Sequence, residues 1–153
     1  MIGLIQRVSS ASVSVHGELI GRIDRGLLAL IAVQQGDGPS QANRLAERLL
    51  AYRVFADESG RMNLNLVEVG GGLLLVPQFT LAADTSKGNR ASFAKAANPD
   101  LGQTMFDELV RCTKDRWSMV ETGAFGADMD VRLVNQGPVT FWLEAPPALP
   151  AGG

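Results

Sequence analysis

The chain contains few side chains of the types that act as catalysts. His16 is its only histidine and Cys112 its only cysteine. His16 precedes a glycine in a segment that predicts a turn, where an exposed imidazole is the common state. Cys112 falls on the apolar side of a predicted helix, where a small buried thiol is the common state. We therefore expect neither a Ser-His-Asp or Cys-His nucleophile nor a zinc site, and no cofactor.

Two further groups of residues could carry chemistry, but their spacing does not support it. The acids Asp57, Glu58 and Asp84 could act in acid–base catalysis, yet nothing in the sequence pairs them. We interpret each of them as a solvated loop charge. The glycine triplet at 70–72 precedes its predicted strand, whereas a dinucleotide-binding loop follows one, so it is not a nucleotide motif.

A basic loop is the first feature that could meet a ligand. The segment 82–100 shows no periodicity, and a loop of this length in a compact domain is more often functional than idle. Its stretch 85–99 carries Lys87, Arg90 and Lys95 with no acid among them. Such a charge run is usually only a solvated face, but it could also contact a phosphate or the end of a nucleic acid.

The segment PQFT at 77–80 is the second feature. A predicted buried strand runs directly into Gln78, Phe79 and Thr80 and then into the basic loop. Strand ends that feed long loops commonly present backbone N–H groups and hydroxyls to ligands. Local evidence leaves two roles open for Thr80: a hydroxyl that satisfies the backbone at the strand end, or a catalytic group.

The run NQGPVT at 135–140 is the third feature, between predicted strands at 130–134 and 139–143. A tight hairpin is more usually closed by Asn-Gly or Asp-Gly, because its central residues need positive φ. Pro138 cannot donate a ladder hydrogen bond, it restricts Gly137, and a Gly-Pro bond has an appreciable chance of being cis. Taken alone, the pair is best interpreted as a type VI turn without a ligand role.

One domain must position these features, since 153 residues can bury a substantial core. The composition, with 46% hydrophobic and 20% charged residues and a net charge of −2, gives no general argument for nucleic-acid binding. We identify no signal peptide, no stretch of transmembrane length and no disulfide framework, so we expect a cytoplasmic protein.

Strands dominate the predicted first half. The apolar positions are even-numbered in 2–8 and odd-numbered in 11–15, which predicts a bulge around Ser9-Ser10, close to Arg7. Further strands are predicted at 18–24, at 27–33 and within 70–81, with irregular structure at 57–66.

Two helices complete the prediction. Ser40 is the expected cap of a helix over 41–55, and Asn98-Pro99-Asp100 predicts the start of a second helix. This order of elements predicts a single α+β domain, in which antiparallel or mixed β-sheets pack with two main helices over residues 1–144. The composition of 145–153 predicts a disordered tail.

Four segments together resemble one known family. They are MIGLIQRVSSASVSV, RMNLNL, PQFTLAADTSKGNRASF and LVNQGPVTFWL. In order and separation they resemble the D-aminoacyl-tRNA deacylases from Met1 to about Glu144, and four motifs in register are highly specific. The resemblance implies a homodimeric editing hydrolase that cleaves D-aminoacyl-tRNA into free tRNA and D-amino acid. It also implies removal of glycine mischarged onto tRNA for alanine.

The resemblance assigns a role to the Gly-Pro pair. The family's Gly-cis-Pro motif falls on Gly137 and Pro138, with Arg7 beside it, and it acts as a chirality filter inserted into the partner subunit's active site. A cis bond would turn both carbonyl oxygens to one side, as acceptors for the substrate's α-ammonium. The side chain of an L-amino acid would then be directed into rigid backbone and excluded. The side chain of a D-amino acid turns away, and glycine has no side chain to clash.

The resemblance also assigns the catalytic groups. The family's SQ-x-T motif falls on 77–80, where the backbone N–H groups of Phe79 and Thr80 are candidates for the oxyanion site, beside Gln78. The 2′-hydroxyl of the terminal adenosine would help to activate water, which leaves the Thr80 hydroxyl as an orienting group. Phe125 and Met129 are candidates for lining the adenosine pocket. In the basic loop, the candidates for contact with the acceptor end are Lys87 and Arg90.

Two departures from the family pattern keep alternatives open. Pro77 replaces the usual serine, which removes a hydroxyl and a backbone donor just before the site, and Ala91 replaces a usual proline. One alternative is therefore a homodimeric RNA-binding module that has lost hydrolysis. Another is a deacylase with relaxed chirality, which would require a trans bond between Gly137 and Pro138.

Overall fold

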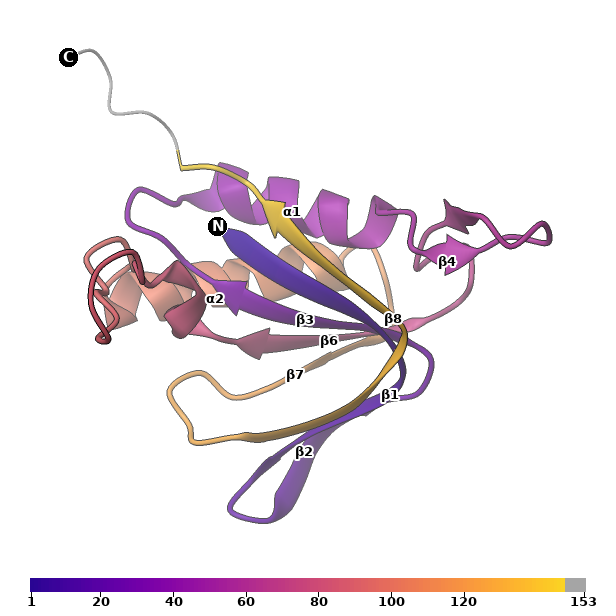
Figure 1. Ribbon diagram of the computed structural model, residues 1–153, viewed down its shortest axis with the longest axis horizontal. Coiled ribbons are helices and arrows are strands. Elements are labelled where there is room, and N and C mark those ends of the chain that lie inside the picture. Colours follow the sequence, from indigo (N-terminus) through magenta and orange to yellow (C-terminus); the bar gives the residue numbers. More distant parts are fainter. Residues whose placement is uncertain (148–153) are drawn as a thin grey trace.

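The pairing of the first and last strands organises the fold, which the computed structural model describes for residues 1–147. Strand β1 (Ile2–Val15) lies antiparallel to β8 (Asp130–Glu144) over almost the full length of both. The other edge of β1 pairs first with β3 (Gly26–Ala32) and, further along, with β2 (Glu18–Ile23). β1 therefore belongs to both halves of the sheet and bends between them (Figure 1).

A parallel extension makes the sheet mixed. β6 (Gly72–Pro77) lies parallel to β3, and β7 (Val120–Thr122) lies parallel to β6. β4 (Phe55–Ala56) and β5 (Met62–Leu64) form a separate antiparallel hairpin. The predicted single α+β domain is confirmed. β7 and the β4–β5 hairpin were not predicted, because strands of two or three residues are too short to show a periodic pattern.

The central strands are covered on both faces. Leu73 and Leu75 of β6 pack in a core cluster with apolar residues of both helices, whereas Leu74 and Val76 pack in a second cluster with Val13 of β1. Successive side chains of a strand point to opposite faces of the sheet. Consecutive side chains of β6 therefore enter two different cores, one on each face of the sheet, and this explains why the strand is continuously apolar. The same reasoning applies to β3.

Helix α1 (Pro39–Ala51) begins earlier than predicted. Its N-cap is Gly38 rather than Ser40, and the Gly38 N–H donates to the side-chain oxygen of Gln41 at 2.9 Å. Proline is well suited to the first helical position, where its missing N–H would have no partner within the helix. The expected cap by Ser40 is therefore wrong.

Helix α2 (Pro99–Lys114) begins as predicted. The Asn98 side chain caps it by accepting a hydrogen bond from the Leu101 N–H at 2.9 Å. The two helices lie side by side on one face of the sheet (Figure 1). No helix within residues 1–147 combines the length and apolarity that a membrane span requires.

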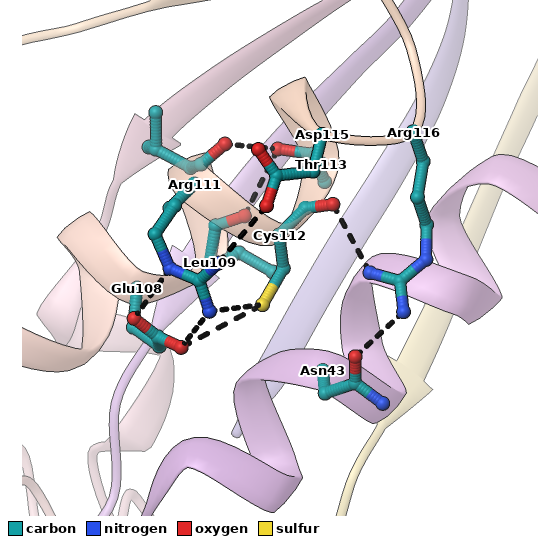
Figure 2. Close-up of polar contacts among 9 residues, drawn as sticks. Asn43, Glu108, Leu109, Arg111, Cys112, Thr113, Asp115 and Arg116 are labelled. Atoms are coloured by element: carbon teal, nitrogen blue, oxygen red, sulfur yellow. Dashed lines mark hydrogen bonds and ion pairs between the residues drawn. The ribbon is translucent and has the colours of Figure 1, made fainter.

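Polar contacts join the end of α2 to α1 (Figure 2). Arg116 donates to the backbone oxygen of Cys112 at 3.0 Å and to the side-chain oxygen of Asn43, in α1, at 2.6 Å. Cys112 is buried, as its place on the apolar side of the helix predicts. The hydrogen bonds from Arg111 hold the pKa of the Glu108 carboxyl below its ordinary value.

The end of β8 continues along the first residues of the chain. Ala145 is buried and its N–H donates to the backbone oxygen of Met1 at 2.8 Å. The Pro146 oxygen accepts a hydrogen bond from the Gln41 side chain at 3.2 Å. The remainder of the predicted tail, 148–153, lies outside the described residues.

The glycines that precede β6 allow two strands to approach closely. Gly26 and Gly72 are paired at the start of β3 and β6, and a Cβ added at Gly26 would lie only 1.9 Å from the Gly72 oxygen. A Cβ added at Gly71 would lie 2.7 Å from a methyl carbon of Leu66. Close packing therefore accounts for Gly71 and Gly72, in agreement with the exclusion of a nucleotide motif, whereas Gly70 has a positive φ of +64° and open space around its Cβ.

We predict that Gly26→Ala destabilises the protein by about 3 kcal/mol, because the atom that the new methyl group meets is backbone and cannot rotate away. Urea unfolding measures the effect. Gly38→Ala is the matched control: the nearest atom to its Cβ is the Gln41 side-chain oxygen at 3.7 Å, and its expected cost is under about 1 kcal/mol. Equal effects of the two substitutions would contradict the close approach.

Candidate active site

Strand β6 ends at Pro77, and the chain then turns into a short 3-10 helix, η1 (Phe79–Ala82), instead of continuing as a strand. The Gln78 N–H donates to the backbone oxygen of Ile31 at 2.6 Å, which extends the β3–β6 pairing beyond Pro77. Pro77 is thus accommodated at the end of the strand, where proline is tolerated, and the register of the pair is kept.

The residues after Pro77 are presented at the surface. Phe79 and Thr80 are exposed, and Gln78 is half-buried. The Gln78 side-chain amide donates to the Thr80 hydroxyl oxygen. The first N–H groups of a helix have no partner within that helix, so the backbone here offers donors to a ligand. The Thr80 hydroxyl accepts from Gln78, and its own proton therefore remains available.

A cavity of about 720 Å³ adjoins this strand end. Its aromatic walls form two pairs, Phe79 with Phe93 at 5.1 Å between ring centroids and Phe106 with Phe125 at 6.5 Å. Met129 also lines the cavity. The structure therefore brings Phe125 and Met129 together with Gln78 and Phe79, although they come from distant parts of the sequence.

Several lining residues were missed in the sequence. Phe93 lies in the basic loop, and Phe106 lies on α2 among core residues, so neither is distinguished by its local pattern. Gly102 offered a signal, because a glycine inside a helix is unfavourable relative to alanine unless something approaches it closely. A Cβ at Gly102 would lie 3.1 Å from the Phe125 ring.

The Gly-Pro pair forms a bulge within one strand rather than the junction of two. β8 runs through it, but four residues, 136–139, lie between the Gln6↔Thr140 and Val8↔Asn135 pairs, where β1 has only Arg7. The interpretation as a turn between two strands is therefore wrong, because both halves of β8 pair with the same neighbour. The shift in β1 pairing falls at 6–10, which agrees with the predicted bulge near Ser9-Ser10.

Arg7 holds this bulge in place. Its Nε donates to the Gln136 oxygen at 3.0 Å and its Nη1 donates to the Val54 oxygen at 2.8 Å. Gly137 has φ +131°, and a Cβ there would lie 2.8 Å from Arg7 Nη2. Gly137 and Pro138 are exposed, and the peptide bond between them is cis. Glycine is therefore required here by both conformation and space.

Within one copy of the chain, the bulge and the cavity lie apart. Gln78 bonds to Ile31 near the end of β3, whereas Arg7 pairs with Leu27 near its start. At about 3.3 Å per residue these positions differ by roughly 13 Å along the strand. β8 also lies across β1 from β3, and the cavity lining includes no residue of 135–140. The two features therefore do not face one ligand within a single copy.

The remaining charged candidates lie at the surface. Lys87 and Arg90 are exposed in the loop. Hydrogen bonds from the hydroxyl and backbone of Ser86 lower the pKa of Asp84. Asp57 has its pKa lowered to about 2, chiefly by a hydrogen bond from the Asn63 side chain. Both acids are thus engaged in their own turns, which agrees with their interpretation as loop charges.

Comparisons with known proteins match the part of the chain that contains these site residues. The model of a family described as "D-Tyr-tRNA(Tyr) deacylase" matches residues 4–144. The chain is 61% identical over 153 residues to a D-aminoacyl-tRNA deacylase of Methylococcus capsulatus, with 100% of both chains covered.

Solved structures agree on the fold. One described as "c-Myc DNA Unwinding Element Binding Protein" has a TM-score of 0.90 and 34% identity, and covers 95% of this chain and 99% of its own. A second, described as a probable eukaryotic D-amino acid tRNA deacylase, has a TM-score of 0.81 and 19% identity. The match covers 94% of this chain and 98% of that structure's chain. The resemblance inferred from the four motifs is confirmed, and the chain belongs to the D-Tyr-tRNA(Tyr) deacylase family.

Proposed function

We propose that the protein hydrolyses the ester that joins a D-amino acid to the 3′ end of tRNA, and that it spares L-aminoacyl-tRNA. Family membership supports the reaction, because the Methylococcus relative is named for it. One observation of geometry carries the proposal: a cavity with aromatic walls is lined by Gln78 and Phe79, and the exposed Thr80 follows directly in the chain. Aromatic walls suit a terminal adenosine, and free N–H groups suit a developing oxyanion.

Catalysis in this site depends on backbone groups and on the substrate. An aminoacyl ester is already activated, so positioning and oxyanion stabilisation can supply much of the rate. The N–H groups of Phe79 and Thr80 bind the oxyanion, and Gln78 orients the Thr80 hydroxyl. Phe125 and Met129 contact the adenosine, whose 2′-hydroxyl helps to activate water. The sole histidine, His16, lies exposed in the β1–β2 turn and takes no part.

A second copy of the chain supplies the chirality filter. Gly137 and Pro138 project from a bulge that Arg7 holds rigid, yet the bulge does not reach the cavity of its own copy. A homodimer in which each bulge enters the partner's cavity would complete both sites. Rigid main chain rejects an L-side chain regardless of its type, and it admits D-residues as well as glycine mischarged onto tRNA for alanine.

The alternative is a homodimeric RNA-binding module without hydrolysis, suggested by Pro77. The intact β3–β6 register and the Gln78 bond to Ile31 favour the enzyme, because the backbone after Pro77 remains supported.

We predict that the purified protein hydrolyses D-tyrosyl-tRNA with kcat/KM at least about 10²-fold above that for L-tyrosyl-tRNA, because backbone sterics exclude the L-residue. Release of labelled tyrosine from the two esters, assayed side by side, measures this ratio. Hydrolysis of both esters would mean that the Gly-Pro pair does not act as a filter. Hydrolysis of neither, with tRNA still bound, would establish the binding module.

A subunit-mixing experiment tests whether the filter acts across the dimer. Phe79→Pro removes a backbone donor at a position that proline tolerates, and Gly137→Ala places a methyl group against Arg7. Each variant alone should reduce activity by about 10²-fold. A 1:1 mixture should recover about one quarter of the wild-type activity, because half of the dimers are mixed and each has one intact site.

The matched control for this experiment is Gly60→Ala, in the β4–β5 hairpin. Gly60 also has positive φ, +81°, but nothing lies within 4 Å of its Cβ. It should leave D-tyrosyl-tRNA hydrolysis unchanged. A mixture of Phe79→Pro and Gly137→Ala that stays inactive, although native mass spectrometry shows mixed dimers, would place the filter within one subunit.

Charge reversal in the basic loop tests its contact with the acceptor end. The double variant Lys87→Glu and Arg90→Glu should weaken tRNA binding, and the slope of log Kd against log salt should fall by about one for each phosphate that the protein no longer neutralises. The control, Arg44→Glu with Lys114→Glu, makes the same charge change on the exposed surface of the helices. If the loop variant leaves binding and its salt dependence unaltered, the loop does not contact tRNA.

A further inference from the structure

The start of the chain carries a buried charge. The α-ammonium of Met1 forms an ion pair with Asp37 Oδ1 at 2.8 Å, and both groups have no exposed surface. The ammonium also donates to the Ala145 backbone oxygen at 2.6 Å and to the Gln34 side-chain oxygen at 3.4 Å. Its three N–H groups therefore have three acceptors, all of them protein oxygens.

Asp37 transmits this contact to the chain that follows β3. Its second oxygen, Oδ2, accepts the Gln34 N–H at 2.7 Å, and its own N–H donates to the Gln34 oxygen at 3.1 Å. A buried carboxylate without its cationic partner is strongly unfavourable. The conformation of the 34–37 turn therefore depends on the ammonium of Met1.

The same turn holds one wall of the substrate cavity. The Gln35 N–H donates to the Lys95 oxygen at 3.0 Å, and the Gln35 side chain donates to the Ala94 oxygen at 2.7 Å. The Ala97 N–H donates to the Val33 oxygen at 3.0 Å. Val33, Gln35, Phe93, Ala96 and Ala97 all line the cavity. The loop segment 93–97, defined here as the cavity loop, is thus attached to β3 through residues next to the Met1–Asp37 pair.

We propose that the α-ammonium of Met1 is a positioning group for the substrate cavity, and that the protein needs this amine unmodified. By holding Asp37 and the 34–37 turn, it fixes the cavity loop, including Phe93 of the aromatic wall. Any formyl or acetyl group on the amine must therefore be removed, by hydrolysis of that amide, before the cavity takes its final shape. The identity of the ligand in the cavity rests on the proposed function. The contacts of the Met1 ammonium, Asp37 and the cavity loop do not depend on it.

A modified amine cannot make these contacts. An acylated nitrogen has one N–H in place of three and no charge, so at most one of the three acceptors keeps its donor and Asp37 is left without a counter-ion. The acyl group would also need space where Met1 has no exposed surface.

The experiment compares four forms of the full chain: free amine, N-formyl, Asp37→Asn, and Asp37→Asn with N-formyl, each verified by intact mass. N-formyl protein is obtained from cells treated with a peptide deformylase inhibitor. Each modification should raise KM for D-tyrosyl-tRNA by about tenfold or more with a smaller change in kcat, because the wall moves while the Phe79 and Thr80 donors remain. The two changes together should not add, since both break one ion pair.

Hydrogen exchange of the cavity loop provides a readout that is independent of activity. Formylation should remove protection at the Ala97 amide and at the Gln35 amide. Trp117→Phe is the control for general destabilisation: it removes a 2.9 Å hydrogen bond to the Gly71 oxygen, at the end of β6 opposite the cavity. It should lower Tm without changing KM or the protection of the cavity loop.

The outcomes separate this inference from the proposed function. Unchanged KM in the N-formyl protein, or a rise in KM that Trp117→Phe reproduces at equal Tm, would overturn the positioning role. Retained protection at Ala97 and Gln35 would overturn it as well. If the free-amine protein hydrolyses no D-tyrosyl-tRNA, the proposed function fails, and Kd for tRNA then replaces KM in the same comparison.

Discussion

The antiparallel pairing of β1 with β8 is the constraint on which the rest of the structure depends. It joins the first and last strands of the chain and leaves β1 with one edge for β3 and β2. Val139, Phe141 and Leu143 of β8 pack against the main core, and a slip of one residue would turn them toward the other face, so the register at this end of the pair is strongly specified. The extra residues 136–139 are therefore confined to one place, opposite Arg7, where they must project from the sheet.

The candidate site is built from backbone held by this framework rather than from reactive side chains. η1 starts where the parallel β3–β6 pair ends, and the bulge starts where the β1–β8 ladder is interrupted. Groups fixed in this way need no reorganisation when charge develops, which is the property that electrostatic stabilisation requires. The same reasoning explains why Pro77 can stand at the strand end: the backbone beyond it is held by the Gln78 bond to Ile31.

Local signals in the sequence predicted elements well where one short segment contains the cause. The Asn98 cap, the buried α2 face and the doubly covered strands follow from caps and from apolar patterns. Prediction failed where a residue far along the chain determines the local structure. Nothing near Gly137 shows that both flanking segments pair with β1, and β7 is too short to leave a pattern. Ser40 was a reasonable cap by residue type, but the proline before it allowed an earlier start.

The sequence by itself determined the class of fold, the family and the unusual backbone positions, since glycine, proline and capping residues act on their own neighbours. Only the tertiary structure decided which groups meet. Arg7 reaches Gln136 across a separation of 129 residues, and the Met1 ammonium reaches the Ala145 oxygen across 144. Phe79 and Phe93 likewise face one cavity with Phe125. Such contacts depend on how strands pair and pack, and that arrangement is a property of the whole chain rather than of any segment.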